Sequence, residues 1–381
     1  MSDERPAVVV FGATGNQGSN VIKHLHAAGW ADIYAVTRDV TTERAQQLPA
    51  VFPGLKMLSG DLEDKESLIA AMRGPRVPGS KRKVNVFFMS TPCLHSTGYA
   101  VDADREVLTG CSLIDAAKEA GIDHMVFSSV ANCDRTGAPS YHASKHHIEL
   151  KLKKSALPYT ILRPVSFLEI WARLGQFSSV SISGMTKGSV RQAWVALDDV
   201  GACAALALQH NKYKHQTLDL CSDQLSGDQM AAALTQLRAA TTGEKIVYKC
   251  AWFMRLFMML FAKSIYEEKV AFQEEGGFSA DCSTLQTMAD TYPPEFKRHG
   301  PLTFEKFLIR YDFETKPLPA ESGWGKNFVY LLAFLGAAIG LLAAVVPEEV
   351  WADIKRRWAF YGLAALFAVA VINKLLSMVR G

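Results

Sequence analysis

The sequence lacks both a strong charge imbalance and any paired-cysteine motif. Its 41 Lys and Arg residues nearly balance 38 Asp and Glu residues, which leaves a formal net charge of +3. Domains that bind nucleic acid usually carry a basic face and a pI above about 9, so we expect no nucleic-acid partner. The seven cysteines are scattered without a C-x-x-C pair, which argues against a zinc site and a disulfide scaffold. Their odd number fits a reducing compartment.

The N-terminus also lacks the pattern of a secretory signal peptide. Met1–Pro6 is charged, and a strand-like run, Ala7–Phe11, follows at once. We therefore expect the N-terminal domain to stay on the cytosolic side of any membrane to which the chain is attached.

The apolar excess of the chain lies at its C-terminus. Phe328–Val346 is a run of 19 residues without charge, close to the roughly 20 apolar residues that span a bilayer. A second apolar run begins at Trp358, and it can span if Lys374 snorkels or the helix extends further. We predict a transmembrane helical hairpin over residues 326–381, with helices at about 328–346 and 358–379, after a linker at 313–325. A buried hairpin of a soluble oligomer and a re-entrant second run are the alternatives.

The first 165 residues alternate strand-like and helix-like segments. Buried-strand runs lie at Ala7–Phe11, Ile33–Thr37, Leu55–Ser59, Val84–Ser90, His124–Ser129 and Tyr159–Arg163. Helical patterns lie between them, at about Gln17–Ala28, Thr42–Val51, Lys65–Met72, Val101–Ala120 and Tyr141–Ser155. This alternation predicts an α/β fold, a doubly wound parallel sheet of the Rossmann type with helices on both faces. Residues 166–312 are interpreted as a smaller substrate-covering portion interleaved with it.

A glycine-rich loop joins the first strand to the first helix, with the spacing G-x-x-G-x-x-G. Glycines let the backbone turn sharply and approach a pyrophosphate closely, and the helix N-terminus offers free N–H groups to that anion. The strand–loop–helix context favours a dinucleotide site over a mere tight turn. We assign to the cofactor Gly12, Thr14, Gly15, Asn16, Gln17 and Gly18.

The ends of the next three strands supply further nucleotide contacts. Arg38 is the first charged residue after the second strand, where an arginine suits the 2′-phosphate of NADP and an acidic residue suits the ribose of NAD. Arg38 therefore favours NADP(H), while the neighbouring Asp39 keeps NAD(H) as the alternative. Asp61 and Leu62 follow the third strand and should border the adenine, and Thr91 follows the fourth strand and should flank the ribose.

Several motifs together resemble the NmrA-like branch of the atypical short-chain dehydrogenases. They are the glycine loop, Val36-Thr37-Arg38, Gly60-Asp61-Leu62, Val126–Ala131, Pro158–Phe167, Leu197–Gly201 and the ending from Tyr292 through Phe304–Phe307. The resemblance covers about residues 7–312 and does not include the apolar C-terminus. It implies a Rossmann domain that usually binds NADP(H), with Pro164 and Val165 against the nicotinamide carboxamide. Some members of the family reduce substrates and others act as redox sensors, so the resemblance leaves both functions open.

Tyr141 and Lys145 form a Y-x-x-x-K match at the start of a predicted helix, where one turn places them on the same face. Carbonyl reduction needs a proton donor beside the hydride acceptor. A nearby ammonium group favours the phenolate of a tyrosine and lowers its pKa from about 10. Lys145 can also hold the nicotinamide ribose, and Ser129, or its neighbour Ser128, would hydrogen-bond the substrate oxygen. Many members of the NmrA-like branch lack this tyrosine, so the alternative is that Tyr141 is only a helix-start aromatic.

Three histidines, His142, His146 and His147, cluster near this motif without a carboxylate or cysteine at ligand spacing. We interpret them as exposed helix residues and expect no bound metal.

The sequence therefore predicts a membrane-anchored NADP(H)-dependent oxidoreductase that acts on a carbonyl or alcohol of a lipophilic small molecule. An NADPH-sensing regulatory or scaffold protein without turnover is the alternative, and a structural subunit of a membrane complex is a third interpretation. The apolar run Trp252–Phe261 is interpreted as a core or pocket-lining helix, or as a segment lying against the bilayer. A homo-oligomer or a complex with a partner protein is left open.

Overall fold

The computed structural model of the chain describes residues 5–30, 32–76, 82–91, 102–170, 178, 181–251, 255, 259, 266, 270, 272–276, 279–292 and 300–318. The predicted hairpin at 326–381 lies outside these residues, as do most of Trp252–Phe261 and residues 319–325 of the predicted linker. Among the described helices, none combines the length and the apolar character that crossing a bilayer requires.

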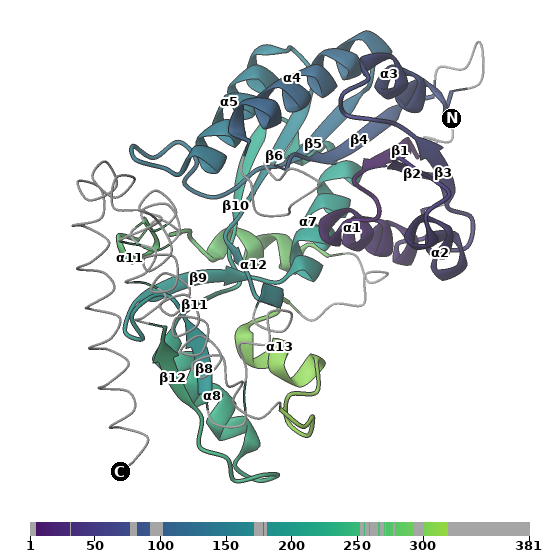
Figure 1. Cartoon of the computed structure of the whole chain (residues 1–381). Coiled ribbons are helices and arrows are strands. Elements are labelled where there is room, and N and C mark those ends of the chain that lie inside the picture. The colour runs from purple at the N-terminus through teal and green to yellow at the C-terminus, as the bar shows by residue number, and fades with distance from the viewer. Residues whose placement is uncertain are drawn as a thin grey trace, which may run out of the picture. The chain divides into compact units, whose positions relative to one another are not determined.

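A parallel sheet forms the centre of the described chain (Figure 1). Its seven strands, in spatial order, are β10 (Gln216–Leu220), β6 (Tyr159–Pro164), β5 (His124–Ser128), β4 (Val84–Met89), β1 (Ala7–Phe11), β2 (Ile33–Thr37) and β3 (Lys56–Ser59). The strand order reverses between β4 and β1, so the loops that follow these two strands diverge and leave a crevice, where ligands bind in open α/β sheets. The predicted Rossmann-type α/β fold is confirmed.

Helices cover both faces of this sheet because its buried strands alternate side chains between two apolar cores. Val8 and Val10 of β1 point into one core, and Ala7, Val9 and Phe11 point into the other. The first core is closed by α1 (Asn16–Ala27), α2 (Glu43–Val51), α7 (Leu197–Gln209) and α12 (Ser283–Asp290). The second is closed by α3 (Lys65–Arg73), α4 (Ala103–Ala120) and α5 (Ser140–Lys154).

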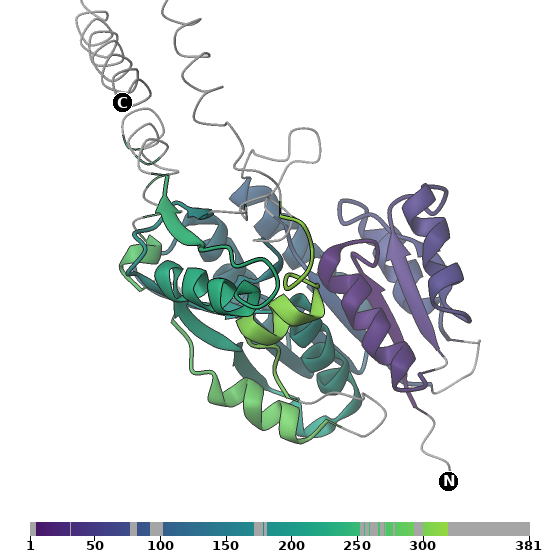
Figure 2. The ribbon, with the colours of Figure 1, turned by 90° about the horizontal axis from the view of Figure 1, so that it is seen from below.

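The covering portion has its own small sheets and a third apolar core. One sheet contains β11 (Asp223–Ser226), β9 (Arg191–Val195) and β7 (Ser166–Phe167), and the other pairs β12 (Val247–Cys250) with β8 (Ser181–Gly184). The remaining elements are η1 (Asn211–Tyr213), α8 (Gly227–Arg238), α11 (Phe272–Glu274) and α13 (Phe304–Arg310). Figure 2 shows the purple N-terminal elements on one side and the teal and green elements of the later chain on the other.

The later chain is interleaved with the main sheet through β10 and α7. β10 extends the sheet by pairing in parallel with β6, and α7 packs against α1. Asp198 of α7 is almost fully buried and binds His24 at 2.8 Å, Lys23 at 2.8 Å and Arg310 at 2.5 Å. A buried carboxylate needs such partners, so Asp198 joins α1, α7 and α13 through charge as well as packing.

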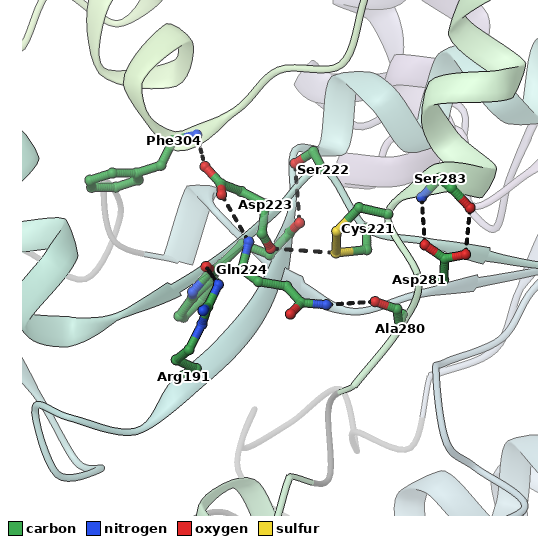
Figure 3. The surroundings of a disulfide bond; sticks show 11 residues. Arg191, Cys221, Ser222, Asp223, Gln224, Ala280, Asp281, Ser283 and Phe304 are labelled. Atoms are coloured by element: carbon green, nitrogen blue, oxygen red, sulfur yellow. Dashed lines mark hydrogen bonds between the residues drawn. A yellow bond between two sulfur atoms is a disulfide. The ribbon is translucent and has the colours of Figure 1, made fainter.

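A disulfide joins Cys221, directly after β10, to Cys282 at the start of α12 (Figure 3). The two cysteines lie 61 residues apart, and Gln224 reinforces the link by donating to the carbonyl of Ala280 at 2.8 Å. Closing a loop of that length stabilises a fold by about 4 kcal/mol in the chain-entropy model. This single pair was not predicted, because spacing along the chain carries no information on cysteines that only the tertiary fold brings together.

Candidate active site

A cavity of about 510 Å³ lies at the carboxyl edge of the main sheet, where the loops after β4, β5 and β6 meet the covering portion. The main-sheet side contributes Gln17, Met89, Ser90, Thr91, Ser128, Ser129, Val130, Tyr141, His142, Lys145, Pro164 and Val165. The structure therefore brings the predicted catalytic residues and five of the predicted cofactor residues to one cavity.

The glycine loop has the close turn that a dinucleotide site needs. Gly12 has φ +66°, and the N–H of Gly15 donates to the carbonyl of Gly12 at 2.8 Å. A Cβ at Gly18 would lie 2.3 Å from that same carbonyl oxygen, so only glycine fits. No side chain of the described chain caps the N-terminus of α1 at Gly15, which leaves its N–H groups for an anion. The loop fits a pyrophosphate.

Gln17 connects this loop to the cavity. It is the second residue of α1, is buried, and accepts a hydrogen bond from the Ser128 hydroxyl at 2.6 Å. The bond fixes the start of α1 against the end of β5. Thr14 and Asn16 lie half-buried on either side of Gly15.

The two charged residues after β2 have different surroundings. Asp39 accepts from the backbone N–H of Thr41 at 2.7 Å and from its hydroxyl at 2.6 Å, and these two bonds lower the pKa of Asp39. Arg38 is exposed at the end of the strand. Because the Asp39 carboxylate is engaged in its own turn, the site fits a phosphate on the Arg38 side better than a ribose held by Asp39.

The other predicted nucleotide residues lie at the expected sheet edge. Asp61 is half-buried, and its carboxylate accepts from the N–H of Glu63 at 3.1 Å, within the turn that leads to α3. Leu62 packs partly against the core beneath α3 and α4. Thr91 is exposed on the cavity, whereas Pro164 and Val165 are buried in its wall. Their roles toward a nucleotide stay predictions.

Lys145 is anchored from two sides. Its ammonium group donates to the carbonyl of Ser90 at 3.0 Å and to the Ser90 hydroxyl at 3.1 Å. It also forms an ion pair at 2.5 Å with Glu106 of α4, whose side chain is fully buried. The Ser144 hydroxyl binds the other oxygen of Glu106. Glu106 was not identified from the sequence, and it fixes the position of Lys145 at the cavity edge.

Tyr141 lies in the first turn of α5, half-buried on the cavity, and packs edge-on against His142 at 4.6 Å between ring centroids. His142 in turn packs edge-on against Phe272 of the covering portion at 5.4 Å. Burial, with the nearby charge of Lys145, lowers the pKa of His142 to about 3, so its imidazole is neutral at physiological pH. The prediction that His142 is exposed was wrong, because the covering portion packs over the start of α5.

Ser128 and Ser129 have separate roles at the end of β5. Both line the cavity, and the Ser128 hydroxyl is engaged with Gln17. The Ser129 hydroxyl lies 3.8 Å from the sulfur of Cys133, which donates to Glu149 at 3.2 Å. Burial raises the pKa of Cys133 to about 12, so this thiol stays protonated. This buried chain of contacts holds Ser129 in place.

Glu149 is the fully buried end of that chain. Arg163 binds both of its carboxylate oxygens, at 2.9 and 2.7 Å. Burial opposes ionisation, but the hydrogen bonds and charge of Arg163 outweigh it and lower the pKa of Glu149. His146 is half-buried beside Cys133 and Glu149, with ligand atoms within 4.8 Å, whereas the sequence predicted an exposed residue. Because Arg163 holds both oxygens, we interpret this cluster as an ion-pair network.

The covering portion supplies the opposite wall of the cavity. Its apolar and aromatic lining residues are Phe167, Ile170, Met185, Trp194 and Tyr248, and its polar ones are Ser166, Thr186, Gln192 and Gln273. Apart from Ser166 and Phe167, which belong to the Pro158–Phe167 motif, none of these was predicted to line the site, because they come from short strands, turns and short helical segments that carry no motif.

Comparisons with known proteins agree with this geometry. The model of the NmrA-like family matches residues 4–308. The NmrA-like family domain-containing oxidoreductase malD of Malbranchea aurantiaca is 27% identical over 273 residues, which cover 65% of this chain and 76% of that protein. Triphenylmethane reductase of Citrobacter sp., solved with NADP(H), has a TM-score of 0.60 and 23% identity, covering 76% of this chain and 98% of its own. An NADPH-dependent quinone oxidoreductase of Escherichia coli, solved with NADPH, has a TM-score of 0.62 and 20% identity, and the match covers 80% of this chain and 99% of that protein. At these identities the two solved structures establish the fold.

Proposed function

The chain belongs to the NmrA-like family, and from that premise we propose that it is an NADP(H)-dependent oxidoreductase acting on a carbonyl or alcohol. The observation that carries the proposal is that Tyr141, Lys145 and Ser129 line one cavity with Gln17 of the glycine-loop helix. A sensor needs the nucleotide site but has no use for a proton donor in the same cavity. The NADP(H) found with the Citrobacter and Escherichia coli proteins supports the choice of cofactor.

The nucleotide would be held by the glycine loop and by Arg38. The loop and the α1 N-terminus bind the pyrophosphate, Arg38 binds the 2′-phosphate, and Pro164 and Val165 lie against the nicotinamide. When bound, the nicotinamide supplies or accepts the hydride. The fit rests on the close turn at Gly12 and Gly18 and on the engaged Asp39 carboxylate.

The protein's own groups would manage the proton. In reduction, Ser129 donates a hydrogen bond to the substrate carbonyl, and Tyr141 transfers its phenolic proton to the oxygen as that oxygen gains charge. Lys145, fixed by Ser90 and Glu106, stabilises the phenolate that remains. The neutral His142 ring supports the Tyr141 ring without adding charge to the site.

A lipophilic substrate is favoured by the wall opposite the catalytic residues. Phe167, Ile170, Met185 and Trp194 present apolar and aromatic surface to the cavity, and methionine adapts readily to flat or irregular ligands. We propose an aromatic or otherwise apolar carbonyl compound. The first test is loss of NADPH absorbance with a panel of aromatic aldehydes, ketones and quinones. Tight NADPH binding without turnover of any member would favour the sensor.

Arg38→Ala should weaken NADPH binding about 10- to 100-fold and leave NADH binding nearly unchanged, because it removes a charged hydrogen bond to the 2′-phosphate. Fluorescence titration of both nucleotides measures this selectivity. Arg44→Ala, an exposed arginine on α2, is the matched control and should bind both as the wild type does. Tighter binding of NADH than NADPH by the wild-type protein would overturn the choice of NADP(H).

We also propose that the chain is an integral membrane protein held by the two apolar runs at 328–346 and 358–379, with the Rossmann domain on the cytosolic side. The support is their apolar length, with no charged residue in 328–346 and Lys374 as the single one in 358–379. After expression in cells, the full chain should remain with membranes through an alkaline carbonate wash, and a chain ending at Leu318 should not. Recovery of the full chain in the soluble fraction as an oligomer would instead indicate a buried hairpin.

A further inference from the structure

The covering portion places a connected set of polar side chains in the largely apolar wall of the cavity. Gln192 of β9, Thr186, Tyr248 of β12 and Gln273 of α11 all line the cavity. They come from four separate segments, so the set exists only in the folded protein. Gln192 is 8% exposed, which makes it a buried polar residue at a ligand-accessible surface.

The directions of the hydrogen bonds within this set follow from the donors available. The single O–H of Tyr248 donates to the carbonyl of Thr186 at 3.0 Å. The contact of 3.4 Å between the two hydroxyls is therefore donated by Thr186. The Thr186 oxygen then accepts from the side-chain amide of Gln192 at 2.9 Å. The Tyr248 phenol keeps its proton for this chain, since burial raises its pKa.

The same reasoning fixes the orientation of both glutamine side chains. The amide nitrogen of Gln192 also lies 3.4 Å from Oε1 of Gln273, so both of its N–H groups have acceptors. Among the described residues, Oε1 of Gln192 has no donor and Nε2 of Gln273 has no acceptor. One acceptor and one donor, side by side, therefore remain for a ligand in the cavity.

We propose that Gln192 and Gln273 form a subsite for a carboxamide-type group of the substrate, an N–H beside a C=O. Gln192 Oε1 accepts from the substrate N–H, and Gln273 Nε2 donates to the substrate carbonyl. This subsite rests on the proposed reductase function and belongs to the covering side of the cavity that Tyr141 and Lys145 also line. A buried site built for such a group discriminates against analogues that leave its polar atoms unpaired.

The test uses two near-isosteric ketones, 4-acetylbenzamide and 1,4-diacetylbenzene, which differ in an amide NH₂ against a methyl group. The full-length protein should reduce the ketone of 4-acetylbenzamide with a kcat/KM about 10- to 100-fold higher than that for 1,4-diacetylbenzene, counted per ketone group. Gln192→Met should lower the ratio of the two kcat/KM values to about 1, mainly by lowering the value for 4-acetylbenzamide.

Gln46→Met, an exposed glutamine on α2, is the matched control and should keep the full preference. Equal kcat/KM values for the two ketones in the wild-type protein would overturn the subsite without any variant. If neither ketone is turned over, the affinity of each ketone for the NADP-bound protein is measured by calorimetry. Equal affinities, or no binding of either ketone, would also overturn the subsite. Failure of the proposed reductase function is distinguishable from failure of the subsite. It would appear as no NADPH binding, or as binding of 4-acetylbenzamide without turnover of any carbonyl compound.

Discussion

Tyr141→Phe should lower the kcat of NADPH-dependent carbonyl reduction by about 10²- to 10⁴-fold while changing the Kd for NADPH by less than about twofold. The substitution removes only the phenolic O–H, so the ring contact with His142 and the position of Lys145 are kept. Single-turnover measurement of NADPH oxidation, with fluorescence titration of NADPH on the same protein, separates the two effects.

The matched control is Tyr159→Phe, at the amino end of β6 and thus at the opposite edge of the same sheet. It should turn over as the wild type does. Undiminished turnover by Tyr141→Phe would contradict the proton-donor role. Turnover that falls together with NADPH affinity would mean that Tyr141 serves nucleotide binding instead.

Gly18→Ala should weaken NADPH binding by at least about 100-fold. The new Cβ would lie 2.3 Å from the oxygen and 2.8 Å from the carbon of the Gly12 carbonyl, and 3.0 Å from Cα of Ala13. All three atoms belong to the backbone, so no side chain can move aside, and the turn that should hold the pyrophosphate must open. Fluorescence titration of NADPH measures the loss, and thermal unfolding reports how far the change spreads.

Gly74→Ala is the matched control, because its Cβ would meet nothing closer than 3.4 Å, an ordinary contact. It should bind NADPH as the wild type does. A Gly18→Ala protein that unfolds cooperatively and still binds NADPH with wild-type affinity would show that the loop does not hold the nucleotide.

The parts of the site that could be predicted are those encoded by spacing within one strand–helix unit. The glycine loop, Arg38 after β2, and Tyr141 four residues before Lys145 are local patterns, and a parallel sheet brings the carboxyl ends of its strands to one edge. Six predicted strand runs therefore became strands of the main sheet, with ends shifted by at most one residue.

The partners of these residues were not predictable, because they lie far away along the chain. Glu106 reaches Lys145 across 39 positions, and the hydrogen bond between Gln192 and Gln273 spans 81. The burial of His142 also depends on the distant Phe272. A helix pattern predicts which residues share a face, but it does not predict what packs over that face.

The sequence by itself determined the fold class, the nucleotide loop and the candidate catalytic pair, because each is encoded by a pattern local to one strand–helix unit or by the alternation of such units. Only the tertiary structure decided that β10 joins the main sheet beside β6, that Cys221 pairs with Cys282, and that two glutamines complete the cavity wall. These contacts depend on which distant segments share a core, and the gain from burying apolar surface, which drives that packing, is non-directional. Local patterns therefore identify the residues proposed to bind the cofactor, whereas the packing of the covering portion determines which residues line the substrate side of the cavity.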